Sequence, residues 1–454
     1  MASFFFYDLE TSGLNPRYDR IMQFAGQRTD MDLRPLGEPY NLLVKLPEDI
    51  LPSPEALLVT GITPQQTARD GVQEPELCRL LMDEIFTPGT IAVGFNNIRF
   101  DDEFIRHTLW RNFYDPYEWS WSEERSRWDL LDVVRLTRAL RPDGIKWSTD
   151  KNGKSVNKLE SLAHDNKLNH EKAHDALSDV TALIAITKLI HERQLKLYDY
   201  LLNMRDKKEV AKLVNLDDPT PFVYASGRYN AEFEKATVAL PIAPGSKPGS
   251  VLVYNLRFDP DAVKFDDKAE RPWLGLPVKE LQYNRCPAVA PLGVLDKTSQ
   301  KRLSLSLKTI QGNLDKLQKN RGVIDKVIDI WRARPDFPPA PDVEGRLYDS
   351  FTTDSDKPRV KTVRESDADA LADLHPKFDD ERLPELLLRY KARNFPTALS
   401  EDEQSTWESY RRTKLERELP GYFNRLAQLA AADADPFVLE EIQLWVESIL
   451  PVDE

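Results

Sequence analysis

Two carboxylates at the end of a short apolar strand constrain this chain more than any other feature. Three consecutive phenylalanines, residues 4–6, lead into Asp8 and Glu10, and a Thr-Ser-Gly turn follows. Side chains two apart on a strand point to the same face, so the two carboxylates lie side by side and repel each other. Mg²⁺ or Mn²⁺, which prefer oxygen ligands, would remove that repulsion. The stretch therefore predicts a metal site, although taken alone it also fits an edge strand with a solvated acidic end.

The composition is that of an ordinary globular protein, large enough for two to four domains. Of the 454 residues, 41% are hydrophobic and 30% are charged, which is typical of soluble proteins. The two cysteines and six histidines show no zinc-ligand spacing, and the cysteine pattern fits a reducing compartment. No stretch has the pattern of a signal peptide or the length of a bilayer span. We therefore expect a cytoplasmic protein with no membrane partner.

Charge is segregated along the chain. The net charge of −13 argues against a protein that coats nucleic acid with its whole surface. Residues 297–334 nevertheless hold ten Lys or Arg against three Asp. This excess predicts either a local nucleic-acid groove or a solvated basic helix face.

An α/β domain is expected first, because short β-like runs alternate with helical periodicity. The strands expected before residue 100 are Ile21–Arg28, Tyr40–Leu46 and Ile91–Phe95. The helices expected there are Ala56–Thr63 and Glu74–Phe86. The next helix begins near Asp101, at the carboxyl end of a strand, where open α/β sheets bind ligands. Asp101 is therefore a further candidate ligand. The alternative is that Asp101 or Asp102 complements the dipole of that helix.

Aromatic and arginine residues are interleaved in residues 110–128. Four of the nine tryptophans of the chain lie there, among several arginines. This composition suits stacking of unpaired bases with phosphate contacts nearby. The alternative is a satellite core beneath a long loop, and some of these rings are expected to pack there.

A strong helix is expected from about Asp175 to Ile190, with Val180 and Leu183 on one face. Asp179 lies near its start, and His174 lies at its entry, where the imidazole can turn toward the acidic residues. A lone histidine before a helix is more often a cap or a core residue. Here His174 lies five residues before Asp179, and three further acidic candidates, Asp8, Glu10 and Asp101, accompany them, which favours a functional role.

Together, Asp8, Glu10, Asp101 and Asp179 with His174 form a D-E-D-D set with a histidine. The segments FYDLETSG, GFNNIRFDDEF and HDALSDV carry them in the order and spacing of the DEDDh 3′→5′ exonucleases, which the chain resembles. Further stretches, among them VTGITPQ, RNFYDPYEWSW, ALRPDGIKW and KARNFPTALS, resemble the bacterial exodeoxyribonuclease I family over nearly the whole chain.

The resemblance implies three domains. These are an α/β ribonuclease H-like nuclease domain (residues 1–194), a small SH3-like β-barrel domain with a helical extension (195–345) and an all-α C-terminal domain (346–454). Composition alone indicates a small β-rich region, a boundary at the PDFPPAP stretch and a helical remainder. In the family the three domains form a C-shaped channel around a single strand, which implies processive cleavage.

The implied chemistry is hydrolysis of single-stranded DNA from its 3′ end, with release of nucleoside 5′-monophosphates. Asp8, Glu10 and Asp179 would bind two Mg²⁺ ions directly, with Mn²⁺ as an alternative, and Asp101 would help to hold the second ion. His174 would be the general base for the attacking water, since imidazole titrates near neutral pH.

The resemblance also implies binding residues. The implied substrate contacts are Glu10, Arg106, Tyr117, Trp121, Arg135 and Lys158. Lys158 stands where the family is expected to have arginine, so the charge is kept but the bidentate fork is lost. The family binds the acidic C-terminal tail of single-strand-binding protein, for which Arg141 and Arg302 are candidates. A monomer and a role in DNA repair or recombination are implied as well.

Two other functions fit part of this pattern. A DEDDh nuclease that trims RNA 3′ ends has the same site, but small enzymes of that kind lack the long β and helical domains. A single-stranded nucleic-acid-binding adaptor with a vestigial nuclease fold would be expected to lose metal ligands. All four acidic residues and the histidine are intact.

Overall fold

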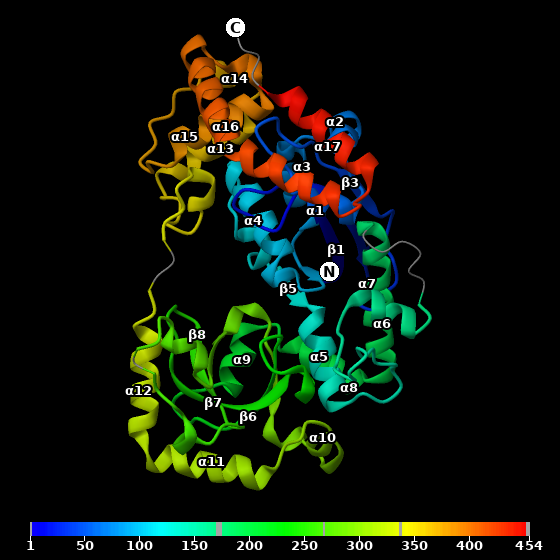
Figure 1. Cartoon of the computed structure of the whole chain (residues 1–454), viewed down its shortest axis with the longest axis vertical. Coiled ribbons are helices and arrows are strands. Elements are labelled where there is room, and N and C mark those ends of the chain that lie inside the picture. Colours follow the sequence, from blue (N-terminus) through cyan, green and yellow to red (C-terminus); the bar gives the residue numbers. More distant parts are fainter. Residues whose placement is uncertain (1, 169–174, 267, 336–337, 451–454) are drawn as a thin grey trace.

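The computed structural model describes residues 2–168, 175–266, 268–335 and 338–450. An α/β domain comes first, a β domain with a helical extension follows, and helices complete the chain (Figure 1). This is the expected order of classes. Within the described residues, no helix combines the length and the apolar run needed to cross a membrane.

The N-terminal α/β domain is built on a five-stranded sheet in the order β3-β2-β1-β4-β5. β1 pairs antiparallel with β2 and parallel with β4, so the strand that carries the two carboxylates is central. The strands are β1 (Ser3–Thr11), β2 (Ile21–Thr29), β3 (Tyr40–Leu43), β4 (Thr90–Gly94) and β5 (Ser126–Asp129).

The two faces of β1 belong to different cores. Phe4 and Phe6 pack in one core with Val180 and Leu183 of a later helix. Phe5 and other odd-numbered residues pack in a second core on the opposite face. Because side chains alternate along a strand, Asp8 and Glu10 lie on the same face as Phe4 and Phe6.

The helices of this domain follow the expected pattern with small differences. They are α1 (Pro54–Thr60), α2 (Pro64–Asp70), α3 (Glu74–Leu80), α4 (Asp101–Arg111), α5 (Leu130–Leu140), α6 (Leu159–Asp165) and α7 (Ala176–Arg193). The helix expected over Glu74–Phe86 is α3, which continues as one π-helical turn, η1 (Leu81–Ile85). α1 ends where Gly61 adopts a left-handed conformation (φ 70°), which glycine tolerates.

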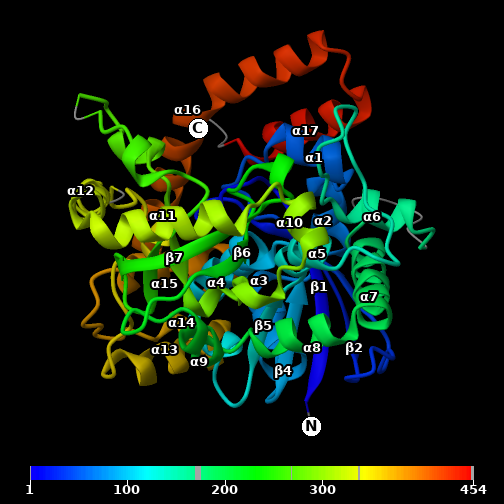
Figure 2. The ribbon, with the colours of Figure 1, turned by 90° about the horizontal axis from the view of Figure 1, so that it is seen from below.

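The β domain contains a five-stranded antiparallel sheet in the order β10-β6-β7-β8-β9. Helices α8 (Leu195–Asn203) and α9 (Lys207–Leu213) lead into it. The strands are β6 (Phe222–Ala225), β7 (Ala236–Pro244), β8 (Ser250–Asn255), β9 (Val278–Gln282) and β10 (Ala288–Pro291). The basic extension forms α10 (Lys297–Arg302), α11 (Leu307–Lys319) and α12 (Arg321–Arg332), which lie along this sheet (Figure 2). α5 and α11 share one apolar core with this sheet.

The C-terminal helices pack against the N-terminal α/β domain. They are α13 (Asp356–Glu365), α14 (Ala368–Ala372), α15 (Leu383–Asn394), α16 (Glu401–Ala431) and α17 (Pro436–Ile449). Trp110 of α4 and Phe113, which lies just after that helix, share a core with Leu383 and Tyr390. α17 lies against α1 and α2.

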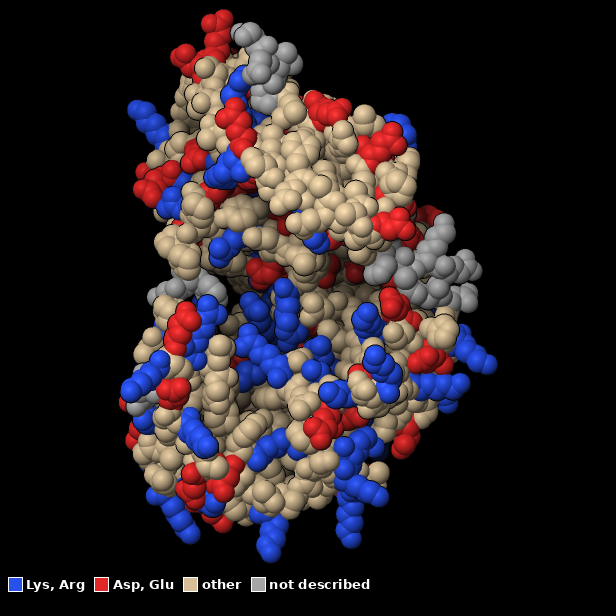
Figure 3. Space-filling model, in the orientation of Figure 1, with Lys and Arg blue, Asp and Glu red and all other residues tan. Residues whose placement is uncertain are grey.

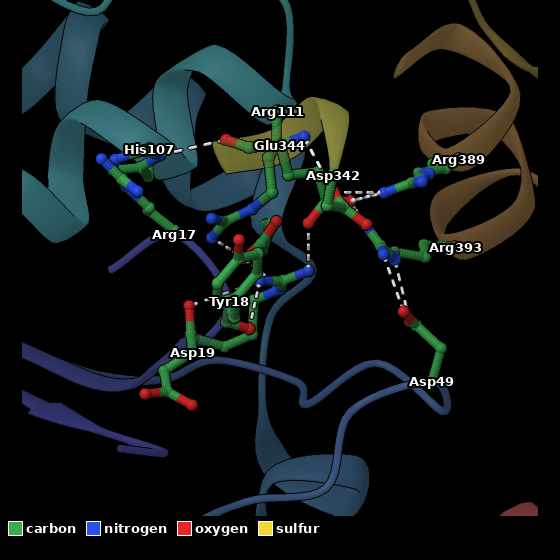
Figure 4. Close-up of polar contacts among 12 residues, drawn as sticks. Arg17, Tyr18, Asp19, Asp49, His107, Arg111, Asp342, Glu344, Arg389 and Arg393 are labelled. Atoms are coloured by element: carbon green, nitrogen blue, oxygen red, sulfur yellow. Dashed lines mark hydrogen bonds and ion pairs between the residues drawn. The ribbon is translucent and has the colours of Figure 1, made fainter. Parts of the chain in front are cut away.

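A buried cluster of charged residues also joins these two parts (Figure 4). The guanidinium of Arg20 donates to Glu344 at 2.6 Å, and Arg393 contacts the same carboxylate. Arg393 also donates to Asp49 at 2.7 Å. Glu344 is only 3% exposed. Despite this burial, the charges of Arg393 and Arg20 hold the pKa of Glu344 well below its ordinary value.

Candidate active site

Three carboxylates converge at one edge of the N-terminal sheet. Asp8 and Glu10 project from the face of β1 that packs on α7, and Asp179 lies in the first turn of α7. One oxygen from each lies within 4.8 Å of the others. The Asp175 side chain fixes the start of α7 by accepting a hydrogen bond from the backbone N–H of Ser178 (3.2 Å). Strand alternation and a helix cap thus assemble the cluster.

Electrostatic repulsion within this cluster is large. Burial, followed by the charges of Asp101, Asp179 and Glu10, raises the pKa of Asp8 well above its ordinary value. Burial and then the Asp179 charge raise the pKa of Glu10 to about 8. Such groups retain protons near neutral pH unless a cation replaces them. The donor set consists of carboxylate oxygens alone, and it fits a hard divalent cation such as Mg²⁺ or Mn²⁺.

Asp101 borders this cluster. It is the first residue of α4 and is 4% exposed. Burial and the neighbouring Asp102 charge raise its pKa to about 8, and its own charge contributes to the raised pKa of Asp8 and Glu10. It is not one of the three residues whose oxygens lie within 4.8 Å. Its role at a second ion stays a prediction, as does that of His174, which lies outside the described residues.

A buried network behind Asp101 was not expected from the sequence. Asp102 is fully buried and accepts hydrogen bonds from the Tyr7 hydroxyl and, at 2.5 Å, from Arg127. Arg127 also donates to the backbone carbonyl of Asn284 in the β domain at 3.0 Å. The sequence contained one signal for this network. Tyr7 lies on the buried face of β1, opposite the face that carries Asp8, and a buried tyrosine hydroxyl usually has a hydrogen-bond partner.

Among the predicted substrate contacts, Arg106 and Tyr117 lie together. The Arg106 guanidinium lies 5.7 Å from the centroid of the Tyr117 ring. Arg135 donates to Asp132 at 2.6 Å and lies against Gly227, where a Cβ would meet its guanidinium at 3.0 Å. Arg135 is therefore at the boundary between the N-terminal α/β domain and the β domain.

The tryptophans of residues 110–128 divide between packing and exposure. Trp110, Trp119 and Trp128 are buried, so the alternative of a packed core is correct for these three. Trp121 is 67% exposed and remains available for stacking. Lys158 is exposed and immediately precedes α6. The sequence could not separate these rings, because composition reports aromatic content but not the direction of each side chain.

The structure brings the two predicted partner-binding residues together. Arg141 donates to the Leu140 carbonyl at 2.7 Å and to the Val294 carbonyl at 3.1 Å. Arg302 donates to the Ala139 carbonyl at 3.2 Å. Both guanidinium groups therefore lie at the C-terminal end of α5, where helix carbonyls favour positive charge.

The molecular surface separates the charges around a central hollow (Figure 3). Lysine and arginine side chains gather on its lower side, over the β domain, and acidic side chains border its upper side. A basic wall opposite an acidic one suits a polyanion that must approach a cation-binding site.

Comparison with known proteins assigns each part of the chain. Family models match residues 5–187 (Exonuclease), 205–333 (Exonuclease I SH3-like domain) and 341–449 (Exonuclease I C-terminal domain). The expected fold is thereby confirmed: a ribonuclease H-like nuclease domain, an SH3-like domain and an all-α C-terminal domain. The protein is an exonuclease with two added domains.

Relatives match nearly the whole chain. Exodeoxyribonuclease I of Haemophilus influenzae is 39% identical over 448 residues, which are 95% of this chain and 95% of the relative. The crystal structure of E. coli exonuclease I with a dA16 oligonucleotide has a TM-score of 0.93 and 35% identity, over 99% of this chain and 100% of that chain. The zinc-bound form of the E. coli complex with single-stranded DNA gives the same TM-score, identity and coverage. The chain belongs to the exodeoxyribonuclease I family.

Proposed function

We propose that this enzyme degrades single-stranded DNA from the 3′ end and releases nucleoside 5′-monophosphates. The observation that carries the proposal is the Asp8, Glu10 and Asp179 cluster, with oxygens within 4.8 Å of one another. The oligonucleotide complexes of the E. coli relative, which is similar over its whole length, support the substrate class.

The residues of the cluster would bind two divalent cations, Mg²⁺ in the cell with Mn²⁺ as an alternative. When bound, such ions activate water and stabilise the leaving oxygen. Asp8, Glu10 and Asp179 supply the oxygens that hold them, and Asp101 supports the second position. His174 would accept the proton of the attacking water. Tyr7 and Arg127 hold Asp102, and so fix the start of the helix that carries Asp101.

Binding of a single strand without sequence preference needs contacts to phosphates and to base faces. Arg106, Arg135 and Lys158 would supply positive charge, and Tyr117 and Trp121 would supply ring faces. Glu10 would also contact the terminal nucleotide. The central hollow with its basic wall supports passage of a strand between the domains, and hence processive cleavage.

The partner and cellular role follow from the same family. We propose that Arg141 and Arg302 bind the acidic C-terminal tail of single-strand-binding protein, since two guanidinium groups gather at the end of α5. We further propose that the enzyme works as a monomer in the cytoplasm, in DNA repair or recombination.

The test uses three oligonucleotides: unblocked, 5′-blocked and 3′-blocked. Each is incubated with Mg²⁺ or with EDTA, beside duplex DNA and single-stranded RNA. We expect metal-dependent loss of all single-stranded DNA except the 3′-blocked oligonucleotide, and no loss with Asp179→Ala. Faster degradation of RNA would favour an RNA-trimming enzyme. Binding without cleavage would favour the adaptor.

A further inference from the structure

The β domain contains a large cavity of its own. It has a volume of about 1140 Å³ and lies between the sheet and the helices α11 and α12, which flank the sheet in Figure 1. Residues from 228–237, 255–258 and 273–279 line it, together with the first turn of α11 and the end of α12. Ligand sites have volumes of about 300–1,000 Å³, so the cavity has room for an organic ligand. None of the described residues that line it is a predicted metal ligand or substrate contact.

Aromatic side chains form much of the cavity wall. The rings that line it are Tyr229, Phe233, Phe258, Trp273 and Trp331. Trp331 is buried and packs in a small core with Leu252 of β8, so its ring is held in place. Phe258, in contrast, is 53% exposed, and its burial therefore contributes little to stability. Fixed rings beside exposed ones suit a flat apolar group that can lie between them.

The same cavity is lined by cations. Its four basic residues are Arg228, Arg257, Lys279 and Arg334, and none of the described residues that line it is acidic. Lys279 donates to the Tyr224 hydroxyl at 2.8 Å, and Arg257 donates to backbone carbonyls, the closest at 2.6 Å. These acceptors are neutral, so they do not balance the two positive charges. Arg334 differs, because it pairs with Glu280 at 3.4 Å.

Partial burial leaves these positive charges poorly solvated. Burial lowers the pKa of Lys279 to about 7, the Asp132 charge opposes this shift, and nearby arginine charges, among them that of Arg228, add to it. Burial also lowers the pKa of Arg257 to about 10. The Nε–H of Arg257 is buried and has no acceptor among the described residues, although buried donors are usually satisfied. A ligand anion would supply both negative charge and hydrogen-bond acceptors.

We propose that this cavity binds a free nucleoside 5′-phosphate, at a site separate from the acidic cluster. The base would lie against the rings, and the phosphate would contact Arg228, Arg257 and Lys279. A neutral aromatic ligand would leave the cations unmatched, and inorganic phosphate would leave the rings unused. The mononucleotides whose release is proposed above are one source of such a ligand, but binding at this site does not depend on cleavage.

The test measures binding of 2′-deoxyadenosine 5′-monophosphate to the wild-type protein by calorimetry in EDTA. Without a cation the acidic cluster repels a phosphate, so binding there is suppressed. We expect one bound nucleotide, and binding of deoxyadenosine or inorganic phosphate at least about tenfold weaker, since each lacks one half of the contacts. Excess oligothymidylate should leave the nucleotide bound. Its displacement would assign the cavity to the DNA strand and overturn the proposal.

Two exposed residues of the cavity provide the variants. Arg228→Gln and Phe258→Ala are each expected to weaken nucleotide binding about fivefold or more, through loss of a charged contact and of a stacked ring. Lys247→Gln is the control for charge, because Lys247 is exposed in the turn between β7 and β8. Phe437→Ala is the control for the ring, because Phe437 is 62% exposed on α17.

The proposal is wrong if the wild-type protein does not bind the nucleotide, or if the cavity variants bind it as tightly as the controls. Equal melting temperatures confirm that the variants are folded. Degradation of single-stranded DNA with Mg²⁺ is measured in parallel on the wild type. Its absence would contradict the proposed function, whereas absence of nucleotide binding in EDTA would contradict only the assignment of this cavity.

Discussion

Replacing Glu344 with glutamine should destabilise the protein far more than loss of an ordinary ion pair. Glu344 is 3% exposed and is contacted by Arg20, Arg389 and Arg393, all of them nearly buried. Removing one partner of a buried ion pair costs about 3–5 kcal/mol, because the remaining charges stay buried and uncompensated. We expect a loss of that size in the free energy of unfolding.

The pH dependence of this loss has a defined sign. The pKa of Glu344 in the folded protein lies well below its ordinary value, chiefly because of the Arg393 and Arg20 charges, which outweigh its burial. A lowered folded pKa means that the stabilisation is fully present above the unfolded value, about 4.3 for glutamate. It is lost as the pH falls from there toward the folded value. The difference between the wild type and Glu344→Gln should therefore be constant at neutral pH and shrink below about pH 4.3.

The assay is denaturant unfolding at several pH values, followed by tryptophan fluorescence. Glu381→Gln is the control, because Glu381 pairs with Arg346 on the same segment at 3.0 Å but is 82% exposed. An exposed pair contributes about 0–1 kcal/mol. Equal stability of the two variants at neutral pH would refute the reasoning, as would a difference that grows on acidification.

Three further predictions concern tryptophan packing, DNA binding and the partner site. Trp119→Ala should lower the free energy of unfolding by about 3–5 kcal/mol, since Trp119 is 1% exposed. Trp121→Ala should leave the melting temperature unchanged and weaken binding of single-stranded DNA. Calorimetry measures the loss of stability, and anisotropy measures the loss of binding. Lys158→Ala should reduce the slope of log affinity against log salt by about 0.7 if Lys158 contacts a phosphate, and an unchanged slope would exclude that contact. The double variant Arg141→Glu and Arg302→Glu should lose binding of an acidic tail peptide by calorimetry while degrading naked single-stranded DNA at the normal rate; unchanged peptide binding would remove both residues from the site.

Local periodicity predicted part of the acidic cluster, and the family resemblance supplied the rest. Alternation along β1 places Asp8 and Glu10 on one face, and the apolar face of α7 turns Asp179 toward the same core. The start of α7 was also predictable, because Asp175 is a strong N-cap residue. These are rules of neighbouring residues, and they hold without knowledge of the rest of the fold.

Contacts between distant segments were not predictable in the same way. Arg20 and Glu344 are 324 residues apart, and nothing in either local sequence indicates the other. The burial of Trp110 depends on the C-terminal helices that cover it. Likewise, the local sequence around Arg127 predicts a surface residue. Its hydrogen bond to the Asn284 carbonyl forms only because the β domain lies beside it. The roles of such residues become visible only when the domains are assembled.

The central claim is that Asp8, Glu10 and Asp179 hold divalent cations for hydrolysis of a DNA strand. Anomalous diffraction from crystals of the enzyme grown with Mn²⁺ and a single-stranded oligonucleotide tests it most directly. We predict Mn²⁺ peaks within about 2.0–2.4 Å of carboxylate oxygens of these three residues, at normal oxygen-ligand distances, and loss of the peaks in Asp179→Asn. Mn²⁺ bound elsewhere, with cleavage undiminished in Asp179→Asn, would contradict the account.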